Sequence, residues 1–319
     1  MYEIVVVGAG QLGSRHLQGL ASLHKTARLH MVDPSHPAIE KAKARVREIA
    51  GERIAADIKE HSGAATLPRQ IDLAIIATTA DCRLSAMTDL LGHARVKYLV
   101  LEKVLFQKFA QYEQASDLIG QHNSVAWVNC PRRVYPVYQT IKGWFALETL
   151  VHVEIFGGGW GLGCNGIHFV DLFSFLTDRQ PTCFDISGLK PGFVPARRLG
   201  YVEYSGTLRA HAGDQLLVLT ANQDSSLRHL VTLRSEQQNV VIDEIGGTAW
   251  RWQGQDKFES LNFRLPYQSE ITASLVTGIL EHGRCHLPSY EESAALHLAF
   301  LEALATHGVE GRAEACLVT

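Results

Sequence analysis

Three glycines near the start of the sequence, Gly8, Gly10 and Gly13, follow a short apolar run and have the spacing G-x-G-x-x-G. The first permits a tight turn, the second lets another molecule approach the backbone closely, and the third lets a helix pack against a strand. A helix that starts here directs free N–H groups and the positive end of its dipole at a phosphate. The spacing predicts a site for the pyrophosphate of a dinucleotide, with Gln11 and Leu12 at the helix start.

The residues around this turn fit a strand–helix–strand unit. The apolar run Ile4–Val7 precedes the turn, a helical pattern follows it, and a second strand, Arg28–Val32, ends in Asp33. Asp33 comes about 20 residues after the last glycine, where an acid would bind the adenosine ribose hydroxyls. Its charge favours NAD over the 2′-phosphate of NADP, although Ser35 and His36 leave NADP open.

Two further predicted strands, Asp72–Ala77 and Tyr98–Leu101, end in polar residues. In sheets of parallel strands, ligands bind beyond the carboxyl ends of the strands. We therefore expect four polar residues at these ends to border the cofactor. They are Thr78, Thr79, Glu102 and Lys103.

The remaining pattern predicts a doubly wound parallel sheet over residues 1–130 and a mostly antiparallel open sheet over residues 131–319. The first part adds a strand over Ser124–Asn129 and a weaker strand candidate over Arg53–Ala56. The second part contains a glycine-rich break, Gly157–Gly163, then an apolar helix, Ile167–Leu176. Five strand-like runs follow, over residues 202–208, 215–221, 230–235, 239–244 and 249–253, and two helices, over 267–282 and 291–304. The tail after residue 307 is expected to be poorly ordered.

The composition excludes several classes of protein. The chain has 319 residues, 46% of them hydrophobic, and a net charge of −3, so neither nucleic acid nor an anionic membrane is an expected partner. It has no apolar run near the roughly 18 residues of a spanning helix and no basic segment before its first apolar run. The six cysteines include no C-x-x-C pair. We expect a cytoplasmic protein with reduced thiols.

Acid–base chemistry is predicted from His168, which follows the glycine-rich break together with Asp171. Oxidation of an alcohol needs a base for the hydroxyl proton, and histidine, with an ordinary pKa of about 6.5, is suited to this. Lys103 could hold the same oxygen. From the residues alone, a buried histidine of an apolar helix is the favoured interpretation of His168, and a surface lysine is the alternative for Lys103.

A metal site is a further alternative, because Cys164, His168 and Asp171 have the spacing i, i+4, i+7 and could share one helical face. Gly166 and the preceding loop suggest that Cys164 lies outside the helix. We therefore expect no metal.

The stretch GAGQLGSRH, the pair Glu102-Lys103 and the His168–Asp171 pair together resemble the glucose-fructose oxidoreductase and inositol dehydrogenase family, often written Gfo/Idh/MocA. The resemblance implies an NAD(P)-dependent oxidoreductase that forms a homodimer or homotetramer. The family motif E-K-P lies at Glu102-Lys103-Val104, with valine in place of proline. In the family motif D-x-x-x-H-x-x-D, this sequence keeps His168 and Asp171 but has cysteine in the position of the first acid.

The resemblance implies roles for individual residues. Lys103 would reach the nicotinamide ribose and the substrate, His168 would be the acid–base residue, and Asn165 and Asp171 would bind substrate hydroxyls or orient the histidine. Lys103, His168 and Asp171 form the predicted catalytic set. Further candidate substrate contacts, each of which could instead be a packing residue, are Arg132, Tyr135 and Trp160.

The predicted function is transfer of a hydride between nicotinamide and a secondary hydroxyl or ketone of a sugar, polyol or nucleotide-activated sugar. Two alternatives remain open. One is a catalytically silent regulatory protein that senses the nicotinamide cofactor, which the replaced acid and the missing proline favour. The other is reduction of an imine or a tetrapyrrole on the same scaffold.

Overall fold

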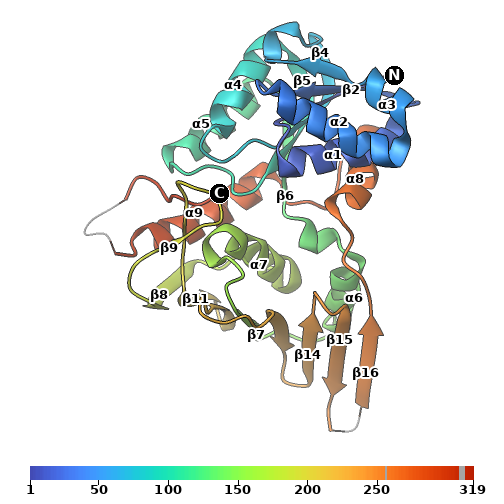
Figure 1. Cartoon of the computed structure of the whole chain (residues 1–319). Helices are drawn as coiled ribbons and strands as arrows, with labels where there is room; N and C mark the ends of the chain where they lie inside the picture. Colours follow the sequence, from blue (N-terminus) through green and yellow to red (C-terminus); the bar gives the residue numbers. More distant parts are fainter. Residues whose placement is uncertain (256, 309–312) are drawn as a thin grey trace. The chain divides into compact units, whose positions relative to one another are not determined.

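The computed structural model describes residues 1–255, 257–308 and 313–319 (Figure 1). These residues form two compact units. The first unit comprises Met1–Phe106, Ala110–Asn129 and Pro266–Glu291, and the second comprises Gln107–Phe109, Cys130–Leu265 and Glu292–Thr319. The predicted domains, 1–130 and 131–319, stay a prediction, because a compact unit is not by itself an independently folding domain.

The first unit is built on a six-stranded parallel sheet with the order β3-β2-β1-β4-β5-β6, which confirms the predicted doubly wound fold. Its strands are β1 (Tyr2–Val7), β2 (Ala27–Val32), β3 (Lys59–His61), β4 (Gln70–Ile76), β5 (Arg95–Glu102) and β6 (Val125–Asn129). Its helices are α1 (Gln11–Leu20), α2 (His36–Ala50), α3 (Glu52–Asp57), α4 (Arg83–His93), α5 (Ala110–Gln121) and α8 (Gln268–His282), with short 3₁₀ turns at Ala21–Leu23 and Ala64–Thr66. Figure 1 shows α1, α2 and α8 on one side of this sheet and α4 and α5 on the other.

Helix α8 comes from late in the chain and packs against α1. Their backbones are close at Gly19, where a Cβ atom would lie 2.4 Å from the carbonyl oxygen of Ser269. One predicted element of this unit is wrong: residues 53–56 belong to α3 rather than to a strand. Gly51, with a φ of +86°, ends α2, and the chain turns back into a helix that buries Ala55.

The second unit contains an eight-stranded sheet with the order β16-β15-β14-β13-β7-β12-β11-β8. Only the β7–β12 pair is parallel among the pairs of this sheet that the structure describes, so the predicted mostly antiparallel sheet is confirmed. Its strands are β7 (His152–Gly157), β8 (Cys183–Leu189), β11 (Gly206–Ala212), β12 (Gln215–Ala221), β13 (Leu230–Arg234), β14 (Gln238–Asp243), β15 (Thr248–Gln253) and β16 (Lys257–Asn262). A separate two-stranded sheet pairs β9 (Val194–Pro195) with β10 (Val202–Glu203). The helical elements are a 3₁₀ turn at Pro131–Val134, α6 (Pro136–Trp144), α7 (Leu162–Thr177) and α9 (Tyr290–Ala305), whose first two residues belong to the first unit.

The sequence did not predict β8 and β16, which are the two edge strands of this sheet. Most of their residues are at least partly exposed, so they carry little of the apolar pattern that marks a strand. The predicted strand 202–208 is in fact two strands. The chain leaves β10 at Tyr204 and enters β11 at Gly206, whose φ is +111°.

Helix α7 begins at Leu162, five residues before its predicted start at Ile167. Gly163, which was predicted to lie in the glycine-rich break, and Gly166, which was predicted to precede the helix, lie inside it and allow close packing. A Cβ at Gly166 would lie 2.6 Å from the ring of Phe300, and a Cβ at Gly163 would lie 2.9 Å from Val318. Cys164 is therefore inside the helix, contrary to the prediction.

The chain after His307 includes residues 309–312, which lie outside the described residues. The prediction of a poorly ordered tail is wrong for residues 313–319. The Cys316 amide donates a hydrogen bond to the Gln107 carbonyl oxygen (2.9 Å), and the Phe109 amide donates to that of Glu314 (3.1 Å). Among the described residues, no helix has the length and apolar character needed to cross a membrane.

Candidate functional site

The turn after β1 is shaped by two glycines whose side chains would collide with the protein itself. Gly8 has a φ of +99°, and a Cβ there would lie 2.9 Å from the Thr78 amide nitrogen. A Cβ at Gly13 would lie 1.7 Å from the Gly8 carbonyl oxygen. Contacts within the protein therefore explain why both positions need a glycine, without any ligand.

Gly10 is different, because nothing in the described part of the chain requires a glycine there. An added Cβ would have no described atom within 4 Å, and the φ of −66° is accessible to any residue. Gly10 is the N-cap residue of α1, and no side chain caps this helix end. An exposed glycine before an uncapped helix leaves room for a ligand phosphate on the backbone N–H groups, beside the exposed Gln11 and Leu12.

Asp33 lies beside the same turn. One carboxylate oxygen accepts a hydrogen bond from the Ala9 amide (2.7 Å), and the other accepts from the Ser35 amide (2.8 Å). These bonds hold the half-buried carboxylate against the glycine loop, and each oxygen keeps a lone pair for a ligand hydroxyl. The arrangement fits the predicted ribose contact.

The loops after β4 and β5 are joined by Arg83, whose side chain is fully buried. Its guanidinium donates hydrogen bonds to the backbone carbonyl oxygens of Thr78, Val104 and Leu105. Burial opposes the charge and lowers the pKa of Arg83 to about 10, which leaves it cationic at neutral pH. The Thr78 hydroxyl is buried and has no hydrogen-bond partner within the described chain, while Thr79 contacts the thiol of Cys82 (3.0 Å).

Glu102 forms the centre of a buried polar network at the end of β5. Its carboxylate accepts from His16 Nε2 (2.7 Å) and Asn129 Nδ2 (2.6 Å), and His16 Nδ1 lies 3.0 Å from the Thr272 hydroxyl. Burial disfavours the charged carboxylate, but these hydrogen bonds outweigh it and hold the pKa of Glu102 below its ordinary value. The network ties β5, β6, α1 and α8 together directly before the half-buried Lys103. The Lys103–Val104 peptide bond is cis.

The start of α7 is capped from a distant strand. The Glu203 carboxylate accepts hydrogen bonds from the Gly163 amide (2.6 Å) and the Cys164 amide (3.1 Å). Asn165 lies in the first turn, and its side-chain amide donates to the Trp160 carbonyl oxygen (2.7 Å). His168 follows one turn after Cys164 and is half-buried. A carboxylate thus lies at the start of this helix although position 164 has none.

Asp171 forms a bidentate ion pair with Arg133, whose Nε and Nη2 atoms lie 3.0 and 2.6 Å from its two oxygens. Arg133 also binds Glu292 (2.9 Å). Burial raises the pKa of Asp171 to about 6, even though Arg133 acts in the opposite direction. The side chain is 1% exposed, so it lies in the interior of the second unit.

Two of the predicted substrate contacts of the second unit, Arg132 and Trp160, pack against the same ring, that of Phe169. Arg132 binds the buried Glu244 through two hydrogen bonds (2.9 and 2.8 Å), and its guanidinium lies 4.1 Å from the centre of the Phe169 ring. Trp160 donates from its indole nitrogen to the Thr220 carbonyl oxygen (2.8 Å) and contacts the edge of Phe169. The half-buried Tyr135 is the N-cap residue of α6.

The predicted residues thus fall into two sets. The first unit carries the set Gly8, Gly10, Gln11, Leu12, Gly13, Asp33, Thr78, Thr79, Glu102 and Lys103. The second unit carries the set Arg132, Tyr135, Trp160, Asn165, His168 and Asp171. Their assignment as cofactor, substrate or catalytic residues stays a prediction.

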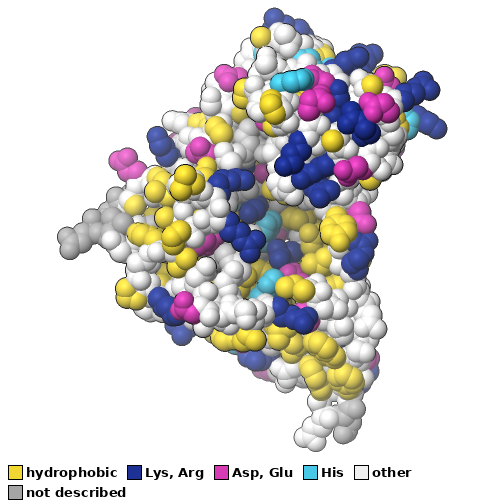
Figure 2. All heavy atoms as spheres, in the orientation of Figure 1, with side chains coloured by type: hydrophobic (Ala, Val, Ile, Leu, Met, Phe, Trp, Pro, Cys, Tyr) yellow, Lys and Arg dark blue, Asp and Glu magenta, His cyan; other side chains and the backbone are white. Residues whose placement is uncertain are grey.

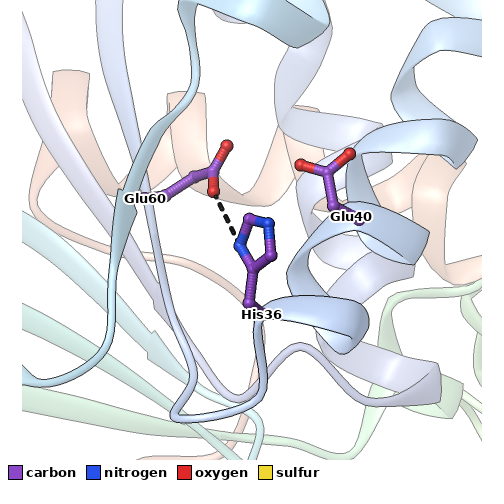
Figure 3. Close-up of side chains that lie close together, drawn as sticks. All are labelled: His36, Glu40 and Glu60. Atoms are coloured by element: carbon purple, nitrogen blue, oxygen red, sulfur yellow. Dashed lines mark ion pairs between the residues drawn. The ribbon is translucent and has the colours of Figure 1, made fainter.

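A group of potential metal ligands occurs elsewhere in the described chain. Figure 3 shows His36 and Glu40 on α2 beside Glu60 of β3, with His36 Nδ1 3.3 Å from a Glu60 oxygen. Lys43 forms an ion pair with Glu60 and so already supplies a cation to this group. The ligand atoms of Cys164, His168 and Asp171 are not gathered in the described structure, so the alternative of an ion on α7 lacks its geometry.

Sequence reasoning missed several residues around these sites. His16 lies in the glycine-loop stretch, one helical turn after the third glycine. This position could have indicated that His16 faces the interior and binds a buried polar residue. Arg83 and Glu203 gave no such signal, because their partners are backbone atoms of distant segments. The pair of Arg133 and Asp171 is likewise a contact between residues far apart in the sequence.

Comparisons with known proteins agree with this fold. No protein-family model matches the sequence, and no curated protein matches it. Solved structures match over nearly the whole chain. UDP-N-acetylglucosamine 3-dehydrogenase GnnA from Acidithiobacillus ferrooxidans has a TM-score of 0.74 at 13% identity, covering 95% of this chain and 96% of its own. An oxidoreductase from Agrobacterium radiobacter, in complex with NAD+, L-tartaric acid and magnesium, has a TM-score of 0.74 at 12% identity and 98% coverage of both chains.

A third structure is the super-repressor mutant of Gal80p from Saccharomyces cerevisiae, with a TM-score of 0.74 at 12% identity and 95% coverage of both chains. It is named for repression rather than for catalysis. At these identities the likeness is one of fold. The chain has the fold of the Gfo/Idh/MocA-type NAD(P)-dependent oxidoreductases, as its motifs predicted.

Proposed function

We propose that this protein is an NAD-dependent oxidoreductase that acts on a secondary hydroxyl or ketone of a sugar, polyol or nucleotide-activated sugar. The observation that carries the proposal is Gly10, a glycine that neither its φ nor any described neighbour requires, at the uncapped start of α1. A pyrophosphate on the helix N–H groups accounts for it. The dehydrogenase name of GnnA and the NAD+ bound by the Agrobacterium protein support the same reading.

The residues around Asp33 favour NAD over NADP. A ribose 2′-phosphate would bring two negative charges beside the Asp33 carboxylate, whereas free ribose hydroxyls would donate to it. His36, a residue that could have bound that phosphate, is paired with Glu60. Glu40 and Glu60 add carboxylates to the same region, and Lys43 offsets only part of their charge.

A bound nicotinamide supplies the hydride acceptor for alcohol oxidation and the donor for ketone reduction. Lys103, at the carboxyl end of β5, holds the substrate oxygen by donating a hydrogen bond. His168 takes the hydroxyl proton in oxidation and returns it in reduction. The bidentate bond to Arg133 supports a role for Asp171 in holding α7 rather than in touching the substrate.

The experiment follows nicotinamide absorbance while the protein is mixed with NAD or NADH and a panel of sugars, polyols and nucleotide sugars. His168→Ala is compared with His211→Ala, a change of an exposed histidine on β11 of the same unit. We expect turnover by wild type and by His211→Ala, and loss of at least about 10²-fold in His168→Ala with NADH binding retained. Equal rates in the two variants would contradict the role of His168.

A regulatory protein that senses the cofactor is the second candidate. The cysteine at position 164 and the Gal80p neighbour, named for repression, favour it. It predicts tight NADH binding without turnover across the whole panel. Binding measured by nicotinamide fluorescence, beside the absorbance assay, separates this outcome from a protein that binds no nicotinamide.

The open face of the eight-stranded sheet supports self-association as a homodimer or homotetramer. Phe156 of β7 is paired with Leu230 of β13, and Trp252 of β15 is paired with Phe258 of β16. The exposed fractions of these four residues are between 36% and 55%. Figure 2 shows hydrophobic side chains at the surface over strands in the lower part of the view. An apolar face of this kind is typical of a subunit interface. Light scattering on wild type and on Trp252→Glu tests it, since a wild-type monomer would contradict the proposal.

A further inference from the structure

The second unit contains a buried carboxylate with an unusual number of partners. Glu244, the residue after β14, accepts hydrogen bonds from Arg132, from the Tyr138 hydroxyl (2.7 Å) and from His229 Nε2 (3.0 Å). Burial opposes its charge, but the charge of Arg132 and these hydrogen bonds hold the pKa of Glu244 far below its ordinary value. Glu244 is therefore a permanent acceptor at neutral pH.

A permanent acceptor fixes the tautomer of the histidine bound to it. A neutral imidazole carries one proton, and the bond to Glu244 places that proton on Nε2 of His229. Nδ1 is then the unprotonated nitrogen, which can accept a hydrogen bond. Within the described chain Nδ1 has no hydrogen-bond partner, and the side chain is 16% exposed.

The His229 ring is held in a defined place by aromatic neighbours. It contacts the ring of Phe169 at 5.7 Å between centroids and the ring of Trp160 at 6.3 Å. Its backbone is fixed as well, because a Cβ at Gly157 would lie 2.5 Å from the His229 Cα. Phe169 directly follows His168 on α7, so His229 contacts the helix that carries His168.

These observations describe an oriented hydrogen-bond acceptor in the same unit as the candidate acid–base residue His168. In a buried structural histidine, both ring nitrogens would be expected to bond to protein atoms. Here the Glu244 carboxylate binds one nitrogen and two aromatic rings hold the imidazole in place, while the other nitrogen is left for an outside donor.

We propose that His229 is a substrate-binding residue whose Nδ1 accepts a hydrogen bond from a hydroxyl group of a polyhydroxylated substrate. This rests on the proposed oxidoreductase function and deepens it, since it requires a substrate with a hydroxyl besides the one that is oxidised. Glu244 is the positioning residue that sets the tautomer. The proton and hydride of the reaction move elsewhere, so loss of His229 weakens binding rather than the chemical step.

The first experiment compares three variants with the substrate that wild type turns over best. His229→Phe keeps the ring contacts but removes both nitrogens. His229→Gln can still donate to Glu244 and offers an oxygen acceptor near the position of Nδ1. Tyr138→Phe is the control. It also removes a hydrogen-bond donor to Glu244, but the side chain of Tyr138 is fully buried.

We expect His229→Phe to raise KM about tenfold, the value of one hydrogen bond, with kcat changed less than about twofold. His229→Gln should recover most of the lost affinity. Tyr138→Phe should lower thermal stability without raising KM. An unchanged KM in His229→Phe, or an equal rise in Tyr138→Phe, would overturn the proposal, because the histidine would then act only through the packing around Glu244.

A second measurement needs no turnover. Diethyl pyrocarbonate modifies accessible unprotonated imidazole nitrogens, and mass spectrometry locates the product. We expect modification of His229 in the free protein and protection by NADH together with glucose, myo-inositol or a nucleotide-activated sugar. Equal modification with and without these compounds, or none in the free protein, would refute the proposal. Failure of the proposed function is seen separately, as absence of NADH binding to wild type.

Discussion

Replacing Gly10 with alanine should separate cofactor binding from folding. The added methyl group has no described atom within 4 Å, and the φ of −66° suits alanine. The cost to the fold is that of a poorer helix cap, about 1 kcal/mol, or about 2 to 4 °C in melting temperature. The same methyl group would stand where a pyrophosphate must approach the backbone.

The expected loss of affinity follows from that overlap. Forcing one extra methyl group into a packed contact costs about 1 to 3 kcal/mol. This corresponds to NADH binding that is about 5- to 150-fold weaker, since 1.4 kcal/mol is about tenfold in a dissociation constant. Gly13→Ala should behave differently, because its Cβ would meet the Gly8 carbonyl oxygen at 1.7 Å. That change should reduce stability by at least about 3 kcal/mol.

The assay is nicotinamide fluorescence titration beside thermal unfolding. Gly63→Ala is the matched control: Gly63 is another N-cap glycine of the first unit, its backbone is extended, and its Cβ direction is open. We expect Gly63→Ala to bind NADH like wild type. If Gly10→Ala also binds NADH like wild type, the glycine loop does not hold the pyrophosphate, and the main argument for the proposed function is lost.

Three other predictions follow from the contacts. Asp33→Ala should weaken NADH binding more than NADPH binding, and equal weakening in parallel titrations would count against the ribose contact. Arg83→Met leaves three backbone carbonyl oxygens without their donor, so thermal unfolding should show a loss of about 3 kcal/mol or more, with weaker NADH binding. The pKa of Glu244 is lower in the folded state, so its stabilisation is present above its unfolded pKa of about 4.5 and is lost as the pH falls below it. Glu244→Gln should therefore flatten the fall of unfolding free energy below about pH 5, and an unchanged slope in urea titrations would refute this.

Local pattern was enough to predict the glycine turn and the residues around it in the first unit. The strand before Gly8, the helix after Gly13 and the acid at Asp33 are consecutive in the chain, and their geometry depends mainly on backbone rules. The central strands of the second sheet were also predictable, because buried strands show their alternation directly. The edge strands β8 and β16 were not, since they bury too little apolar surface to leave a pattern.

The start of α7 depended on contacts that sequence position does not reveal. Its N-terminal amides are capped by Glu203 from β10, and Gly166 is a packing contact with Phe300 rather than a break. In a prediction from local sequence, a glycine such as Gly166 lowers the expected helix propensity, so the true start of α7 could not be predicted.

The sequence by itself thus determined the glycine turn, the order of parallel and antiparallel sheets, and the identity of Lys103 and His168 as candidates. Only the tertiary structure decided what surrounds them: the network on Glu102, the pairing of Asp171 with Arg133, and the histidine oriented by Glu244. The physical reason is that backbone conformation is governed by near neighbours, whereas the state of a buried charge is set by whichever distant residues fold against it.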